Sequence, residues 1–212
     1  MCWSATADLT AGVCIGAIGV ACVARVRRVR RVRELPLAAL PLLLGAHQIV
    51  EAVVWDSGGG AGPATTAWAV IAMPLLALWV PLAVLLASPP GSRRRIAVPL
   101  ASGVATAAVL SYYLATRTVT ADIRGHTIGY AVHLPQPEIV VAGYLLATIG
   151  ALLLCADRTV RLLGVLAAAG AVICAVIWRL EFVSTWCAFA ALASVVMLGW
   201  AWHRGERPRP PA

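Results

Sequence analysis

Residues 36–55 form the segment that most constrains how this chain can fold. The segment is almost entirely hydrocarbon, and a helix of about 20 apolar residues is long enough to cross a lipid bilayer. His47, Gln48 and Glu51 nevertheless lie inside it. A charged Asp, Arg or Lys at the centre of such a helix costs roughly 2.5–3.5 kcal/mol on insertion scales. His47 and Glu51 are four residues apart and therefore share one helix face, which Trp55 continues.

The rest of the chain repeats this apolar character. Only 12% of its residues are charged and 61% are hydrophobic, whereas a soluble domain carries about 25% charged residues. The sequence therefore predicts an all-α, seven-helix transmembrane bundle that forms a single domain over residues 1–203, followed by a disordered cytoplasmic tail over residues 204–212. The predicted spans cover residues 9–24, 36–55, 65–87, 96–116, 139–156, 162–178 and 183–202.

The basic residues predict the orientation of the chain. All 17 are arginines, and 14 of them fall in the segments that this topology places inside the cell. Only Arg117, Arg124 and Arg179 fall outside, so the positive-inside rule predicts an outer N-terminus in a multi-pass protein of the cell membrane. The net charge of +8 is thus an orientation signal, and it does not indicate nucleic-acid binding. The absence of lysine excludes a retinal Schiff base.

Tryptophans and cysteines refine the predicted boundaries. The tryptophans near the ends of the spans predict an aromatic belt, with Trp3, Trp55, Trp68, Trp178 and Trp186 at the outer interface and Trp200 and Trp202 at the inner one. The cysteines inside spans are expected to be small apolar packing residues, and they are Cys14, Cys22, Cys155 and Cys174. Cys2 and Cys187 both lie toward the outer face, where the compartment allows a disulfide, although the sequence does not determine the connectivity.

Polar side chains concentrate at the predicted outer end of the bundle. The longest connection, residues 117–138, lies there, and long loops often carry function. We expect an outward-facing pocket between the second, sixth and seventh spans, capped by this loop. The candidate pocket residues are Cys2, Ser4, His47, Gln48, Glu51, His126, Tyr130, His133, Arg179, Glu181, Trp186 and Cys187.

One hypothesis for this pocket is a metal site. His47 and Glu51 are spaced to supply two ligands to a transition metal such as zinc or copper, or to act as a catalytic base with its orienting acid. Cys2, His126 and His133 are the residues that could complete the ligand set. The protein would then be a metal-binding protein or a membrane-embedded metal-dependent enzyme. The usual enzyme signatures, including GxSxG, HExxH and the phosphate-binding loop, are absent from the sequence.

The alternative is a small transporter, receptor or accessory membrane subunit. Its polar cluster would bind a small molecule or lipid from the outer side, or would hold the helices together through hydrogen bonds. Pro74 and Pro81 predict a broken helix in the third span, a feature that transporters use, although the sequence has no visible inverted repeat. The substrate and the oligomeric state are not indicated by the sequence.

Three short stretches carry a resemblance to a known family. They are the opening Met1-Cys-Trp-Ser-Ala5, the segment Gly45-Ala-His-Gln-Ile-Val-Glu51 with the Leu-Pro-Leu motif before it, and Val183-Ser-Thr-Trp-Cys187. Together they resemble a family of small bacterial multi-span membrane proteins that open with Met-Cys-aromatic-Ser-Ala and carry a His/Gln/Glu cluster in the second span. The resemblance covers essentially the whole chain. It implies no activity, because the family has no assigned function.

Overall fold

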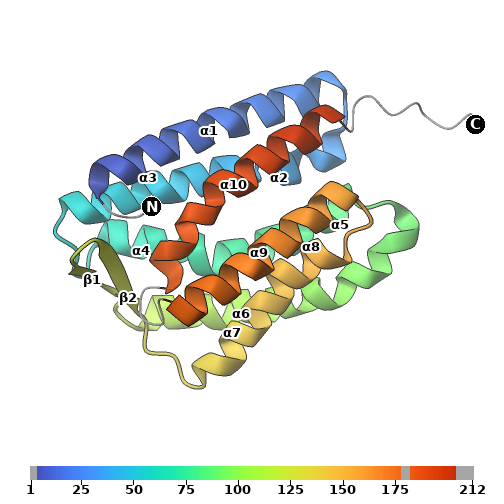
Figure 1. The fold of residues 1–212 in the computed structure, drawn as a ribbon. Helices are drawn as coiled ribbons and strands as arrows, with labels where there is room; N and C mark the ends of the chain where they lie inside the picture. The colour runs from blue at the N-terminus through green and yellow to red at the C-terminus, as the bar shows by residue number, and fades with distance from the viewer. Residues whose placement is uncertain (1–3, 178–181, 204–212) are drawn as a thin grey trace, which may run out of the picture.

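The protein folds into an elongated helical bundle with a small β-hairpin at one end (Figure 1). A computed structural model describes residues 4–177 and 182–203, and it describes side chains for residues 4–173 and 189–203. The helices are α1 (Ala5–Arg28), α2 (Leu35–Ala38), α3 (Leu40–Asp56), α4 (Pro63–Val70), α5 (Leu76–Ala87), α6 (Arg93–Thr116), α7 (Pro137–Leu145), α8 (Ala151–Leu154), α9 (Arg158–Ile177) and α10 (Phe182–His203). π-Helical turns over Ile71–Leu75 and Leu146–Gly150 join α4 to α5 and α7 to α8.

Five helical runs in the described residues are long and apolar enough to cross a membrane. They are Ala5–Arg28, Val32–Asp56, Pro63–Ala87, Pro90–Thr116 and Pro137–Leu154. Large apolar side chains also cover much of the outer surface, as at Val20, Val98 and Val172, which are 61%, 63% and 63% exposed. Hydrocarbon on the outside of a helical bundle is stable where the surroundings are lipid. These features fit a multi-pass membrane protein, and the all-α prediction is confirmed apart from the hairpin.

The backbones of α1 and α3 approach closely where the two helices cross. A Cβ atom added to Gly45 of α3 would lie 2.8 Å from the carbonyl oxygen of Gly12 and 2.8 Å from the amide nitrogen of Gly16, both on α1. A Cβ atom added to Gly19 would lie 2.6 Å from the amide nitrogen of Leu42. Small residues allow this approach of two backbones, which is how membrane helices gain packing without a hydrophobic driving force.

The prolines of the third span do not break it. Pro74 lies in the π-helical turn over Ile71–Leu75, and Pro81 lies within α5, so the helical run continues from Pro63 to Ala87. The widened turn presents the carbonyl of Ala72 to a neighbouring helix, where the Tyr144 hydroxyl donates to it over 2.6 Å. The second π-helical turn, in the fifth span, contains no proline, which is why the sequence did not indicate it.

The two ends of the bundle differ in charge and structure (Figure 1). One end, here called the arginine end, carries the connections over residues 29–34, 88–92 and 155–157, and α10 finishes there. The opposite end, here called the hairpin end, carries the connection over residues 57–62, the β-hairpin and the start of α10. Among the described residues the hairpin end holds two arginines, Arg117 and Arg124, and all the others lie at or near the arginine end.

The predicted loop over residues 117–138 contains a β-hairpin. Strand β1 (Thr120–Arg124) pairs antiparallel with β2 (Thr127–Ala131), and Arg124 lies opposite Thr127 across a two-residue turn. Gly125 opens that turn with a φ of +62°, a conformation that glycine adopts without steric cost. Threonine, isoleucine and tyrosine on the two strands favour extended backbone, so the segment is ordered where a loop was predicted.

The aromatic-belt prediction is wrong for two of the tryptophans. Trp68 is fully buried and Trp200 is 1% exposed, so both belong to the interior of the bundle. The guanidinium group of Arg31 lies 5.5 Å from the Trp200 ring centroid, and it donates to the carbonyl of Ala201 over 2.8 Å. Trp202 keeps the predicted interfacial exposure, and the Arg25 guanidinium lies 5.8 Å from its ring centroid. Cation–π contacts of this kind tie the end of α1 to the end of α10.

Candidate functional site

The site begins with three polar residues that lie within two turns of α3. His47, Gln48 and Glu51 are 5%, 1% and 0% exposed, so all three polar side chains face protein. They lie from the middle of α3 toward its end at Asp56. The remaining buried residues of this helix are apolar or small, and they allow it to pack against α1 and α10 on its other faces. Burial of three polar groups in an apolar helix requires partners for them from neighbouring elements.

An aromatic column covers one side of these residues. Trp68 of α4 is fully buried, and its ring stacks on the Tyr130 ring with a centroid separation of 3.4 Å and an interplanar angle of 5°. The imidazole ring of His47 lies against Trp68 at a centroid distance of 4.9 Å and an angle of 42°. Trp68 therefore joins a residue of α3 to a residue of the hairpin, and it couples the position of the hairpin to the polar cluster.

The hairpin also reaches the cluster through a hydrogen bond. The Tyr130 hydroxyl donates to Oε1 of Glu51 over 3.4 Å, a long bond between an element outside the helices and the most buried acid of α3. The hairpin is held at this place by two backbone hydrogen bonds between Gly60 and Ala121, of 2.7 and 3.0 Å. Ile128 adds a buried apolar contact with the α3–α4 end of the bundle.

Asp8 is a second buried acid in this region. It lies in the first turn of α1, is fully buried, and accepts a 2.8 Å hydrogen bond from Nε1 of Trp55 through its Oδ2 atom. The bond ties the start of α1 to the end of α3. Asp8 was not among the candidate residues predicted from the sequence. Its position at the start of an apolar helix, level with the end of the second span, was the available signal.

Two buried donors of this site have no acceptor in the described part of the chain. Nε2 of Gln48 and Nε1 of Trp68 have no hydrogen-bond partner among the described residues, and both residues are at most 1% exposed. A buried polar group left unsatisfied costs about 1–3 kcal/mol. Such groups in a folded protein call for an explanation, and an acceptor supplied from outside the described residues is the simplest one.

The predicted pocket residues are only partly brought together. Tyr130 contacts Glu51 directly and His47 through Trp68 of the third span, although the pocket was predicted between the second, sixth and seventh spans. Trp68 was missed because a tryptophan near a span end is typical of the lipid interface. Ser4 is exposed and caps α1, its hydroxyl accepting from the Ala7 amide over 3.2 Å.

The two loop histidines lie at the surface. His126 occupies the exposed turn of the hairpin, and His133 is exposed beyond β2, where its carbonyl oxygen accepts a 2.8 Å bond from Arg117. Within the described residues, no three His, Cys, Asp or Glu side chains group closely enough to hold a metal ion. His126 and His133 therefore do not complete such a group with His47 and Glu51.

Several predicted site residues lie outside the described part of the chain. Cys2, Arg179 and Glu181 lie outside the described residues, as do the side chains of Trp186 and Cys187. The disulfide that the compartment allows between Cys2 and Cys187, and the predicted tail over residues 204–212, lie outside them as well. Cys14, Cys22 and Cys155, the cysteines whose side chains are described, form no disulfide with one another.

Comparison with known proteins places the chain in a family. The profile described as "Family of unknown function (DUF6629)" matches residues 1–211, which is essentially the whole chain. No curated protein and no solved structure matches it. The prediction that the chain belongs to a family without an assigned function is confirmed by this match. The chain belongs to DUF6629, a family of unknown function.

Proposed function

We propose that this protein is a seven-span membrane protein that binds a small polar molecule at a buried site under the hairpin. The site comprises His47, Gln48 and Glu51 of α3 with Trp68 and Tyr130. The observation that carries the proposal is the hydrogen bond from Tyr130 of the hairpin to the fully buried Glu51. Ionisable residues inside membrane helices are costly and usually functional. Glu51 lies under an element that could move away from it without unfolding a helix.

The donors of the site indicate what kind of molecule would bind. Gln48 and Trp68 each present an N–H group without an acceptor in the described residues. A ligand carrying carbonyl, carboxyl or ether oxygens would satisfy them, and it would remove a penalty of about 1–3 kcal/mol for each group. A purely structural cluster would instead leave both penalties in place. The protein would then act as a receptor, transporter or accessory subunit of the membrane.

Replacing Gln48 by leucine distinguishes a ligand-binding role of the cluster from a purely structural one. If Gln48 holds a ligand, Gln48→Leu should lower the fraction of protein that carries a bound non-protein molecule at least tenfold. Native mass spectrometry of the detergent-purified protein measures this fraction. Glu51→Gln, which keeps the shape of the side chain, should also lower the occupancy. Glu138→Gln, at an exposed acid that opens α7, is the matched control and should leave occupancy unchanged. Gln48→Leu protein that melts higher and keeps the wild-type mass profile would contradict the proposal.

A metal ion is the second candidate for the same site. His47 and Glu51 are both buried and lie one turn apart on α3, so they could supply two ligands, with a third from outside the described residues. Cys2 is the residue that the sequence offers for that place. Elemental analysis of purified protein should then find about one zinc or copper per chain, lost in His47→Ala. Metal-free wild-type protein that is folded and carries an organic adduct would favour the small molecule.

The orientation that we propose puts the arginine end in the cytoplasm and the N-terminus outside. The support is the arginine excess at one end of the bundle and the positive-inside rule. In intact cells, His126→Cys in the hairpin turn should react with a membrane-impermeant maleimide. Gly91→Cys, between α5 and α6, should react only after the membrane is opened. Each variant is compared with the unsubstituted protein, which accounts for the native cysteines. The reverse labelling pattern would contradict the proposed orientation.

A further inference from the structure

Eight exposed arginines gather at the arginine end of the bundle. They come from three segments that are distant in the sequence, namely the end of α1 with the connection after it, the start of α6 and the start of α9. Figure 1 shows these segments at the same end of the molecule. We call this surface the arginine rim, and its members are Arg27, Arg28, Arg30, Arg33, Arg94, Arg95, Arg158 and Arg161.

A shared apolar core holds the three segments of the rim together. Val26 of α1, Ile96 of α6 and Val160 of α9 are at most 1% exposed, and they belong to one buried cluster with Trp200 of α10. Each of the three aliphatic residues is a direct neighbour of a rim arginine in the sequence. The rim arginines are therefore positioned around one packed core, and they form a single charged surface.

Few acids offset the charge of the rim. Among the described residues, the arginine end holds two acids, Glu34 and Asp157. Glu34 pairs with Arg31, which is not a rim residue, over 2.9 Å. Asp157 accepts hydrogen bonds from the backbone amides of Thr159 and Val160 at the start of α9. Eight arginines against two acids leave this end strongly positive, so it attracts anions.

The start of α6 gains the most from a bound anion. Arg93, Arg94 and Arg95 occupy its first turn, where the helix dipole is positive and acidic side chains are the stabilising ones. The arginines of α1 lie instead in its last turn, where the dipole favours cations. Removing charge at Arg94 and Arg95 is therefore the sharpest change by which to test anion binding at the rim.

The rim adjoins an apolar outer surface. Val98 of α6 is 63% exposed and follows Arg95 by three residues, and Val20 of α1 is 61% exposed and precedes Arg27 by two turns. Trp202 at the end of α10 is 40% exposed, as is typical of a tryptophan in the headgroup layer of a membrane. A phospholipid beside the bundle can thus contact the valines through its chains and the rim through its phosphate.

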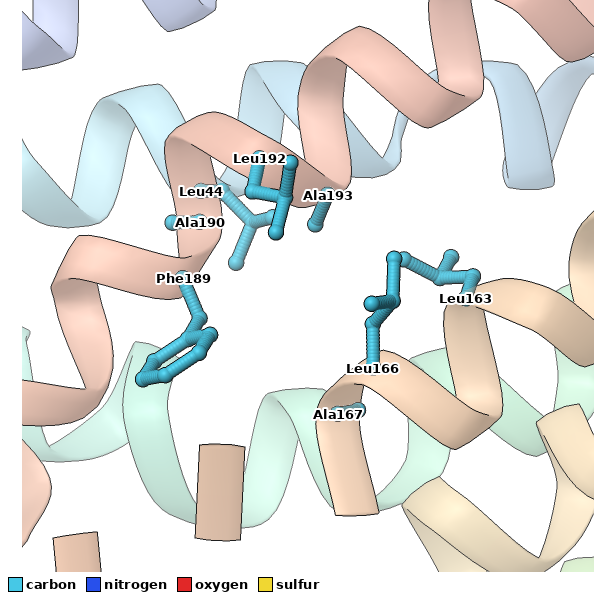
Figure 2. A pocket seen from close by; sticks show the side chains of 8 residues that line it. All are labelled: Leu44, Leu163, Leu166, Ala167, Phe189, Ala190, Leu192 and Ala193. Carbon is cyan, nitrogen blue, oxygen red and sulfur yellow. The ribbon is translucent and has the colours of Figure 1, made fainter. Parts of the chain in front are cut away.

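The apolar cavity between α3, α9 and α10 does not hold the chains of such a lipid. Figure 2 shows Leu163 and Leu166 of α9 facing Phe189 and Ala193 of α10 across this cavity. Its volume is about 60 Å³, which is too small for an acyl chain. The chains therefore stay on the outer surface of the bundle, and recognition depends on the headgroup.

We propose that the arginine rim binds the phosphate groups of anionic phospholipids in the surrounding membrane. Guanidinium groups hold phosphate oxygens through paired N–H donors, and each arginine near an anionic membrane surface adds to the attraction. Phosphatidylcholine is a weaker partner, because its ammonium group cancels the charge of its phosphate. A soluble polyanion such as RNA would match the charge of the rim and leave the adjoining apolar surface unused. This inference does not depend on the buried polar site.

Lipid competition measured by native mass spectrometry tests the proposal. Detergent-purified protein is mixed with equal amounts of phosphatidylglycerol and phosphatidylcholine that carry the same chains, and the retained lipids are counted. Wild-type protein should retain at least tenfold more phosphatidylglycerol. Arg94→Gln with Arg95→Gln should lower this ratio at least threefold. Arg117→Gln with Arg124→Gln is the matched control, because it removes the same charge from exposed arginines at the hairpin end and should leave the ratio unchanged.

A lysine pair separates charge from folding. Arg94→Lys with Arg95→Lys keeps the charge and should keep the wild-type ratio within about twofold. Both side chains are exposed, so the glutamine pair should melt like wild type, and if it does not, the wild-type ratio decides alone. Equal retention of the two lipids by wild type would overturn the proposal, as would an equal fall in the hairpin-end control. Displacement of phosphatidylglycerol by an equimolar RNA oligonucleotide would also overturn it, because a soluble polyanion would then be the better partner.

Discussion

Replacing Gly45 by alanine should lower the melting temperature of the protein by several degrees. The new methyl group would lie 2.8 Å from backbone atoms of Gly12 and Gly16, and backbone cannot rotate out of the way as a side chain can. The two helices must therefore move apart, and overpacking of this kind costs about 1–3 kcal/mol. For a chain of this size each kcal/mol corresponds to about 2–4 °C. Thermal unfolding of the detergent-purified protein, followed by circular dichroism, measures the effect.

Gly16→Ala provides the matched control on the partner helix. It also adds one methyl group to a helical glycine, but its Cβ position has no atom within 4 Å. Alanine is the better helix former, so this variant should be neutral or more stable by about 0.5–1 kcal/mol. Equal melting temperatures for the two variants would contradict the close approach of α1 and α3.

Removing the Trp68 side chain should lower the stability of the protein by several kcal/mol. Trp68→Ala deletes a fully buried indole that contacts both His47 and Tyr130, and buried Trp→Ala changes cost about 3–5 kcal/mol. The hairpin would lose its stacking partner as well. We expect a lower melting temperature together with faster tryptic cleavage after Arg124, which lies exposed at the end of β1.

Trp202→Ala is the matched tryptophan control. Trp202 is 40% exposed, and its ring makes a cation–π contact with Arg25. Its removal should therefore lower the free energy of unfolding by no more than about 1 kcal/mol. Cleavage after Arg124 should then match wild type, because Trp202 lies at the opposite end of the bundle. If Trp68→Ala keeps the wild-type melting temperature and the wild-type resistance to trypsin after Arg124, the hairpin is held independently of the aromatic column.

The sequence predicted helix positions well because each depends on local hydrophobicity. The predicted span over residues 65–87 corresponds to the helical run Pro63–Ala87, and the predicted span over residues 96–116 lies within α6. The boundaries differ where arginines extend a helix past its apolar core, as Arg93 does at the start of α6. Likewise, the spacing of His47 and Glu51 placed them on one face of a single helix, and this follows from helical geometry alone.

Contacts between distant segments could not be predicted in this way. A tryptophan near a span end is typical of a lipid interface, and only the arrival of Tyr130 from the hairpin explains why Trp68 is buried. The hairpin itself depends on pairing between β1 and β2 and on the bonds from Ala121 to Gly60. The same holds for the hydrogen bond between Asp8 and Trp55, which joins residues 47 positions apart.

The sequence by itself thus determined that this chain forms apolar helices, and that one of them carries a histidine, a glutamine and a glutamate at a high energetic cost. Those properties follow from composition and helical periodicity, which are local. Only the tertiary structure decided which groups surround these residues, because packing brings together segments that no spacing relates. Trp68 and Tyr130 above the cluster, and the apolar cavity between α3, α9 and α10, are the results of that packing.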